Sequence, residues 1–472
     1  MSIMWGWCRG LRASRSCAVA LLCTVAVSSG LTEEIEAPTA APEYVQVGDE
    51  EEFVLSPDTA ARWALERNTD VRIQAQSIPE AMGQLRQAWA ARGVQINVSG
   101  SAMWMGPTPT VELPMEPEEE PMEFTVGEDQ HYRATISARK PIYTGGRLRL
   151  GEELAEEGIE AARGGTRIAR LSVAMGASEI TFGVLRAIQL SGVAAAQVTA
   201  VAEHVANAEA MAEAGVVPEF DVVQARTELS RAQEELIAAQ TGTEQARAQL
   251  RRMLALPQET PVEVADAPPP EMPDGAVPEL IDIAFENRPE IEAGQASVRM
   301  AELNLRLAER DRAPSVALTG EYARHTASGL GAEDYSWQVG VVAEKPIFDS
   351  GDRRGKVEAA RARVEAAGLE LQRTQEEIGL EVMQALLAVR EADQRIETAE
   401  QGVAEARERR RMSQLRYREG LAPGIEVIEA DTALAAAEGS LVNAEYDRQL
   451  EVTRLRTAMG ILDVPWQEVE SR

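Results

Sequence analysis

The chain has 472 residues, of which 26% are charged, and a formal net charge of −30. Phosphate binding depends on cationic side chains, so this acidic balance argues against nucleic acid as a partner. The only three cysteines are Cys8, Cys17 and Cys23, which leaves the chain after residue 30 without disulfides or thiol chemistry.

A signal peptide is predicted at residues 1–30. Three arginines precede an apolar run over 17–27, and small residues suited to cleavage follow it. The run is too short to span a bilayer as a helix. Leu22 directly before Cys23 is a poor match to a lipoprotein cleavage site, and the sequence leaves the lipidation of Cys23 open.

The chain then predicts an acidic, flexible lead-in over 31–55 and a first helix. That helix begins at Ser56, a capping residue followed by Pro57 at the first helical position, and runs to about Arg92. No later segment has 18 consecutive apolar residues, so we expect no transmembrane helix.

Strands follow the first helix. Apolar and polar side chains alternate over 94–104 and again from Tyr132, which predicts a β-hairpin over 94–142 with a loop rich in proline and glutamate at 106–129. A matching hairpin is predicted over 314–347.

Each hairpin leads into a very long helix without proline, predicted at 147–214 and 352–419. Apolar residues of the second one recur every seven positions with one four-residue step, which indicates a coiled coil with a stutter. Each long helix reverses at a glycine and returns as a shorter helix, at 219–256 and 424–460.

The chain is a duplication of one large unit. Residues 141–257 reappear at 346–462 with a shift of 205, while 64–71 reappear at 284–291 with a shift of 220. The difference of 15 is an insertion between the two strands of the first half. The predicted segments are a first repeat at 56–256, a Pro-rich linker at 257–276, a second repeat at 277–460 and a tail at 461–472.

Four strands per chain have a consequence for assembly. Backbone groups cannot stay unpaired in hydrocarbon, so membrane strands must close into a barrel, and the smallest barrels have about eight strands. Two copies would give eight strands around a filled interior, whereas three would give twelve around a lumen. The predicted fold is therefore a trimer that joins an α-helical barrel to a twelve-stranded transmembrane β-barrel.

Two sets of motifs carry a resemblance to a known family. The Lys-Pro-Ile-Tyr-Thr-Gly-Gly-Arg segment at 140–147 and its copy at 345–353 resemble the strand-to-helix junctions of TolC-like outer-membrane efflux proteins. The helix reversals at 213–221 and 418–426 resemble the tips of the same family.

The resemblance implies a homotrimeric channel in the outer membrane with a helical tunnel in the periplasm. It implies a passive exit duct of a tripartite efflux pump or type I secretion system, without enzymatic activity or cofactor. The implied partners are a periplasmic adaptor (membrane fusion) protein, an inner-membrane transporter of RND or ABC type, and outer-membrane lipid. The cargo stays open.

The resemblance also assigns site residues. Asp221 and Tyr417 match a pair that bonds to hold the periplasmic gate shut, whereas Ala422 stands where the family has an arginine. Glu426 and Glu429 match carboxylates that line the lumen, where threefold rings would favour cations. The alternative is that both glutamates belong to a solvated helix face.

The tips are expected to contact the adaptor; the alternative is that they are only turns. Gly215 and Gly420 supply the left-handed residue that a helix reversal commonly needs. The predicted contact residues are Gly215, Val216, Val217, Pro218, Gly420, Leu421, Ala422 and Pro423.

The remaining motifs argue against other classes. His131, His204 and His325 lack metal-ligand spacing, so no metal site is expected. Two alternatives to the duct are a trimeric coiled-coil adhesin or stalk and a soluble periplasmic coiled-coil adaptor. A duplicated strand pair, a stutter and two helix reversals favour the duct over the adhesin, and the apolar alternating strands disfavour the soluble adaptor.

Overall fold

The structure, a computed structural model, describes residues 53–104, 106, 110–113, 122–125, 130–265, 268–325 and 334–462. All of them belong to one compact unit, Gln46–Arg472. The predicted signal peptide and most of the tail lie outside the described residues. The helices of the first repeat are α1 (Pro57–Arg67), α2 (Thr69–Ala75), α3 (Ser77–Ala90), α4 (Arg147–Glu213) and α5 (Glu219–Met253). Those of the second are α6 (Val277–Asn287), α7 (Pro289–Glu309), the short 3-10 helix η1 (Arg310–Arg312), α8 (Asp352–Arg418) and α9 (Gly424–Ala458).

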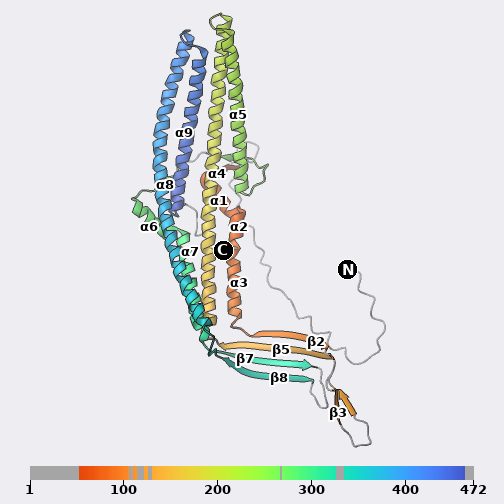
Figure 1. The fold of residues 1–472 in the computed structure, drawn as a ribbon. Coiled ribbons are helices and arrows are strands. Elements are labelled where there is room, and N and C mark those ends of the chain that lie inside the picture. Colours follow the sequence, from red (N-terminus) through yellow and green to blue (C-terminus); the bar gives the residue numbers. More distant parts are fainter. Residues whose placement is uncertain are drawn as a thin grey trace, which may run out of the picture. The chain divides into compact units, whose positions relative to one another are not determined.

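The main sheet is antiparallel, in the order β2-β5-β7-β8 (Figure 1). Its strands are β2 (Gln95–Trp104), β5 (Gln130–Tyr143), β7 (Ser315–His325) and β8 (Tyr335–Glu344). Both predicted hairpins are present as β2–β5 and β7–β8. They pair with each other through β5 and β7, so the two repeats contribute one hairpin each to a single sheet.

The prediction of one continuous first helix is wrong, because the segment forms three helices, α1, α2 and α3. The cap is as predicted: Ser56 Oγ accepts from the Thr59 backbone N–H at 3.2 Å, and Thr59 Oγ1 accepts from the Ser56 N–H at 2.7 Å. The chain leaves the helical conformation at Asn68, where the side-chain oxygen accepts from the Asp70 N–H at 2.8 Å and caps α2. A short polar side chain thus competes with the helix for the backbone.

Three other predicted segments also differ. The lead-in 31–55 ends in a strand, β1 (Phe53–Leu55), which pairs in parallel with β6 (Val262–Val264) of the predicted linker. Leu55 and Val262 are both buried, so packing between these segments fixes them. The predicted loop 106–129 contains a small hairpin of β3 (Thr110–Leu113) and β4 (Met122–Thr125).

The long helices form two hairpins, α4 with α5 and α8 with α9 (Figure 1). Helices α1 to α3 pack along α4, and α6 and α7 pack along α8. The cores of the repeats are equivalent. Val184 and Leu250 of the first are fully buried, as are Val389 and Leu455, their equivalents after a shift of 205.

One described helix qualifies by length and composition as a membrane span. An 18-residue stretch of α4 has a mean hydropathy of 1.4, and only 22% of it is buried. The sequence criterion of unbroken apolar runs does not detect it, because small and polar residues interrupt the stretch. Composition alone is weak evidence for a span.

Candidate functional site

The two helix reversals have the same backbone conformation and hydrogen bonds. At the end of α4 the Val216 N–H donates to the Met211 carbonyl at 2.9 Å, and the Gly215 N–H donates to Ala212. The end of α8 repeats this pattern around Gly420. Gly215 and Gly420 have φ of 71° and 68°, as this helix-ending motif requires. Both predicted glycine turns are therefore present.

The tips expose large apolar side chains. Val216 and Phe220 protrude from the first reversal and Leu421 from the second, with 60%, 71% and 72% of their surfaces exposed. A protein that keeps such side chains in water at two neighbouring turns has a surface suited to contact with another protein. The predicted adaptor contact stays a prediction.

Below the tips, buried polar side chains from α4, α8 and α9 meet. The rings of His204 on α4 and Tyr417 on α8 lie 5.2 Å apart between centroids, tilted by 54°. Gly424 at the start of α9 faces both rings, since a Cβ there would lie 3.5 Å from His204 Nε2 and from Tyr417 Cε2. This cluster joins one helical hairpin to the other.

Charged groups complete the cluster. Asp431 on α9 is buried and forms an ion pair with Arg410 on α8, with 2.6 Å between Nε and Oδ1. Burial raises the pKa of Asp431, and the charge of Arg410 opposes that rise. Burial lowers the pKa of His204, against the attraction of Asp431 and Asp221. The favoured form of His204 near neutral pH is therefore the uncharged imidazole.

The predicted gate pair is close but not hydrogen-bonded. Tyr417 is buried, and its hydroxyl forms no hydrogen bond to any residue that the structure describes. Burial, with a smaller contribution from the charge of Asp221 on α5, raises the pKa of the Tyr417 hydroxyl. The bond expected between Tyr417 and Asp221 is thus absent, and the two interact only through charge.

Glu426 and Glu429 each have an arginine partner. Glu426 lies 3.2 Å from Arg416 and Glu429 lies 3.7 Å from Arg409, both on α8. All four side chains are at least 36% exposed, so the pairs contribute little to stability. They do reduce the net charge that either carboxylate would present to a lumen. Sequence reasoning considered these glutamates without their partners.

Sequence reasoning also missed His204, Arg410 and Asp431 as members of the site. A signal was available, because each falls at an apolar position of its helix. Arg410 and Tyr417 continue the heptad that includes Val403, and Asp431 follows the buried Val427 and Ile428 by one turn. Polar residues in an apolar stripe mark buried polar contacts.

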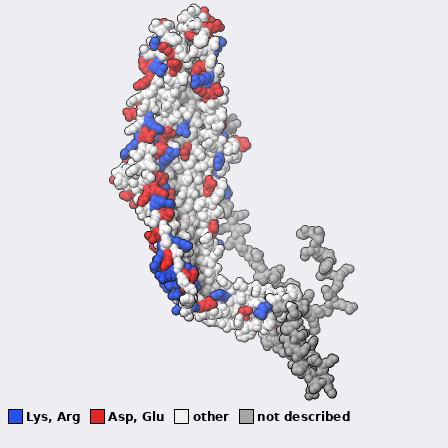
Figure 2. Space-filling view, viewed as in Figure 1, with Lys and Arg blue, Asp and Glu red and all other residues white. Residues whose placement is uncertain are grey.

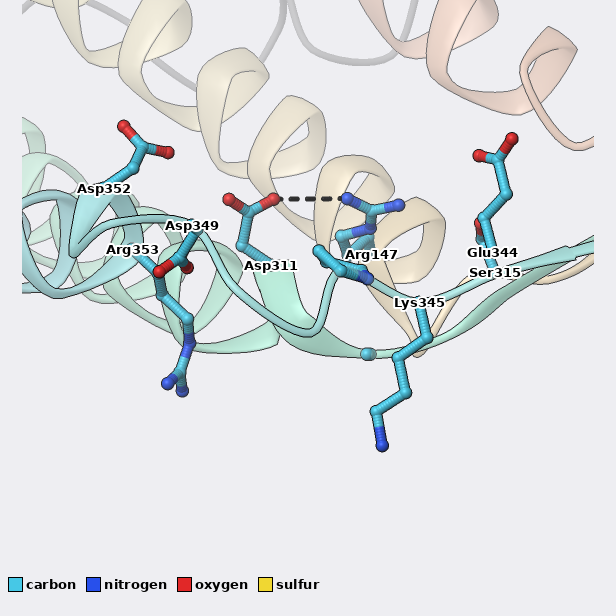
Figure 3. A pocket seen from close by; sticks show the side chains of 10 residues that line it. Arg147, Asp311, Ser315, Glu344, Lys345, Asp349, Asp352 and Arg353 are labelled. Carbon is cyan, nitrogen blue, oxygen red and sulfur yellow. Dashed lines mark hydrogen bonds and ion pairs between the residues drawn. The ribbon is translucent and has the colours of Figure 1, made fainter.

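A second polar site lies where the strands enter the long helices. A pocket of about 580 Å³ is lined by residues of α4, η1, β7, β8 and α8 and of the segments that connect them. Figure 3 shows Arg147 of α4 facing Asp311, at 3.3 Å, while Lys345 points away from Asp311. Lys356 also contacts Asp311, at 3.1 Å. These ion pairs within the chain stabilise the junction between the strands and the long helices.

The close approach of the two repeats explains why the first glycine of the junction motif is needed. Gly145 has φ of 66°, and a Cβ there would lie 2.0 Å from the Cβ of Ala313. Only glycine allows the two repeats to approach this closely between β5 and α4. Among the described residues, no group of three His, Cys, Asp or Glu side chains is placed to hold a metal ion.

A sequence model of the family described as "Outer membrane efflux protein" matches residues 61–256 and 280–461, which is most of the chain and both repeats. The chain belongs to the outer membrane efflux protein family. This is a family of transport channels in the outer membrane with helices in the periplasm, and it includes the TolC-like proteins that the junction and tip motifs resemble. The chain is therefore an outer-membrane protein whose helical part lies in the periplasm.

Individual relatives agree with this assignment. The chain is 21% identical to the cation efflux system protein CusC of Escherichia coli (strain K12) over 89% of this chain and 90% of the relative. It is 26% identical to the outer membrane protein OprJ of Pseudomonas aeruginosa over 37% of each chain. A crystal structure of CusC has the same fold, with a TM-score of 0.71 at 21% identity over 89% of this chain and 95% of that one.

Proposed function

We propose that three copies of this chain form the passive exit duct of a tripartite efflux pump. The observation that carries this proposal is the form of the sheet. Strands β5 and β8 lead into the long helices α4 and α8. Among the described strands, β2 and β8 form the edges of the sheet, and apolar side chains such as Val98, Trp337 and Val339 are exposed. Figure 2 supports a lipid contact, because charged groups are spread along the helices whereas the visible face of the sheet carries few.

Three sheets of four strands make a twelve-stranded barrel without free edges. The helical hairpins, continued from the same chains, enclose a tunnel in the periplasm. The weakly buried apolar stretch of α4 supports this assembly, because it would be covered by helices of neighbouring copies. Energy comes from an inner-membrane transporter of RND or ABC type, and an adaptor protein links it to the exposed tips.

We place the gate at the hairpin tips. His204, Tyr417 and Asp431 hold α4 against α8 and α9 in each copy, and Asp221 adds charge from α5. Ala422 cannot supply the contact of the family arginine, whereas Arg416 at the same tip forms an ion pair with Glu426. The adaptor opens the gate by binding the residues around Gly215 and Gly420.

Fractionation and conductance test the function. The full chain should sediment with outer membranes, require detergent for release and have the mass of a trimer by light scattering in detergent. In planar bilayers it should conduct in small, infrequent steps while the tips are closed. Tyr417→Ala, which empties the buried ring position, should raise conductance severalfold, whereas Tyr446→Ala, a buried tyrosine away from the tips, should not. A stable monomer, or a trimer that never conducts with either variant, would refute the duct.

A further inference from the structure

The internal duplication determines how one copy meets the next. Each strand of the second hairpin has an equivalent in the first: β7 follows β2 by 220 residues and β8 follows β5 by 205. The hairpin registers confirm this equivalence. Gln95 pairs with Arg139 in the first hairpin, and the same shifts give Ser315 and Glu344, which are partners in the second. The two hairpins therefore have the same register along their whole length.

The contact between the hairpins within one chain has an equivalent between chains. Inside the chain β5 pairs with β7. The equivalent of β5 is β8 and the equivalent of β7 is β2, and these two strands are the edges of the sheet. They lie on opposite sides of one chain, so they can meet only when β8 of one copy reaches β2 of the next.

From this equivalence we infer the residue-by-residue register of the seam, which we define as β8 of one copy paired antiparallel with β2 of the next. Ile136 pairs with Tyr322 inside the chain, and the shifts convert this pair to Val341 facing Ala102. The same conversion gives further facing pairs: Val342 with Ser101, Ala343 with Gly100, Glu344 with Ser99 and Val339 with Trp104. This inference rests on the proposed assembly of copies into a closed barrel.

The side-chain pattern agrees with this register. The apolar positions of β2 include Ala102 and Trp104, and those of β8 include Val339 and Val341. The seam places these apolar sets on one face of the sheet. A slip by one residue would bring the apolar face of one strand against the more polar face of the other.

A segment of the chain that lacks a strand partner gives independent support. The last residues of β5 pair with β7 as far as Tyr143. Their equivalents, Lys345 to Phe348, follow β8 but are not in a strand, and Ile347 and Phe348 are 86% and 84% exposed. By equivalence Phe348 faces Ile96 of the next copy. Assembly therefore extends β8 by four residues and covers this pair.

Engineered disulfides test the register in the full chain. Facing residues of an antiparallel pair have Cα atoms about 4.5–5.5 Å apart, within the range for a disulfide. Ala102→Cys/Val341→Cys and Ser101→Cys/Val342→Cys should each form covalent dimers and trimers on oxidation in outer membranes. The same four substitutions re-paired, as Ala102→Cys/Val342→Cys and Ser101→Cys/Val341→Cys, should not. Their side chains would lie on opposite faces.

Two controls separate the possible outcomes. A bond within one chain is too long, because β2 and β8 are three strand spacings apart, roughly 14 Å. Ala102→Cys/Ala343→Cys and Ala102→Cys/Val339→Cys detect slips of two residues. If a re-paired or slipped variant bonds in place of the matched ones, the register is wrong and the duct stands. If no variant bonds although light scattering gives a trimer, the seam itself is wrong. A monomer would remove the proposed function as well.

Discussion

At the scale of single residues, the tips place costly groups in the interior. His204, Tyr417 and Asp431 are each at most 5% exposed, and burying a polar group without full compensation costs free energy. Apolar residues at the same positions would be buried at a lower cost in free energy. The arrangement is explained if these residues must hold two hairpins together and also release them, which suits a gate.

Protonation of His204 should loosen the closed tips. Its pKa is lowered in the folded protein, so as pH falls through about 6.5 the separated state takes up the proton first and the closed state loses stability. Asp431 acts in the opposite direction, because its raised pKa makes the folded state take up that proton first, at pH values above about 3.8. The His204 effect should dominate at the upper end of this range.

Hydrogen exchange of the tip amides between about pH 8 and pH 6 measures this effect. Exchange after correction for its intrinsic rate should accelerate severalfold towards pH 6 in the natural protein. It should become nearly independent of pH in His204→Gln, which stays neutral. His131→Gln, in the sheet, serves as the control and should behave like the natural protein. An unchanged acid response in His204→Gln would exclude His204 as the responsible group.

At the scale of elements, the helical hairpins of the two repeats have equal lengths. The long helices α4 and α8 have 67 residues each, and the return helices α5 and α9 have 35 each. Equal lengths bring both reversals to the same level, so that side chains from four helices can meet there. The glycines that end α4 and α8 fix where each reversal occurs.

Replacing those glycines should destabilise the tips through the backbone alone. No atom lies within 4 Å of a Cβ built on Gly215 or Gly420, so Gly215→Ala and Gly420→Ala introduce only the strain of a left-handed alanine, about 1 kcal/mol each. Gly192→Ala is the matched control in the interior of α4, where the Cβ also meets no atom and alanine should stabilise the helix by up to about 1 kcal/mol. Hydrogen exchange of the amides around each site should become faster in the two tip variants and slower in Gly192→Ala. Changes of the same sign would contradict the backbone explanation.

At the scale of the whole molecule, the net charge of −30 should favour cations in the lumen of the proposed duct. The proposed carboxylate rings contribute less than their number suggests, because Arg416 and Arg409 neutralise them in part. If the glutamates line the lumen as proposed, pairs of opposite charges set the selectivity of the tip, and removing either partner should change it.

Reversal potentials in salt gradients test this balance. Glu426→Gln/Glu429→Gln should lower the cation preference, and Arg416→Gln/Arg409→Gln should raise it. Each change should be at most about fivefold in permeability ratio, since exposed pairs are worth about 1 kcal/mol or less. Arg354→Gln, in an exposed pair at the far end of α8, is the control and should leave the ratio unchanged. If the arginine variants show no increase, the glutamates do not face the lumen.

The sequence by itself determined the duplicated unit, both β-hairpins, the long helices and the glycine reversals. These features depend on local preferences: alternation at Val98 and Val339 selects a strand, and Gly215 tolerates a left-handed conformation that other residues resist. Such signals are carried by neighbouring residues, so they can be read without knowledge of the fold. Asp221 and Tyr417 came from resemblance, which located the tip but supplied a hydrogen bond that is absent.

The tertiary structure decided what depends on residues distant in the chain. The pairing of β1 with β6, the arginine partners of Glu426 and Glu429, and the meeting of His204 with Tyr417 all join segments that the sequence presents separately. The apolar position of His204 in its helix indicates burial, but only the packing of the helices shows which side chains it meets. The burial and ion pairing that make the tips a candidate gate arise when the helices reverse and come together.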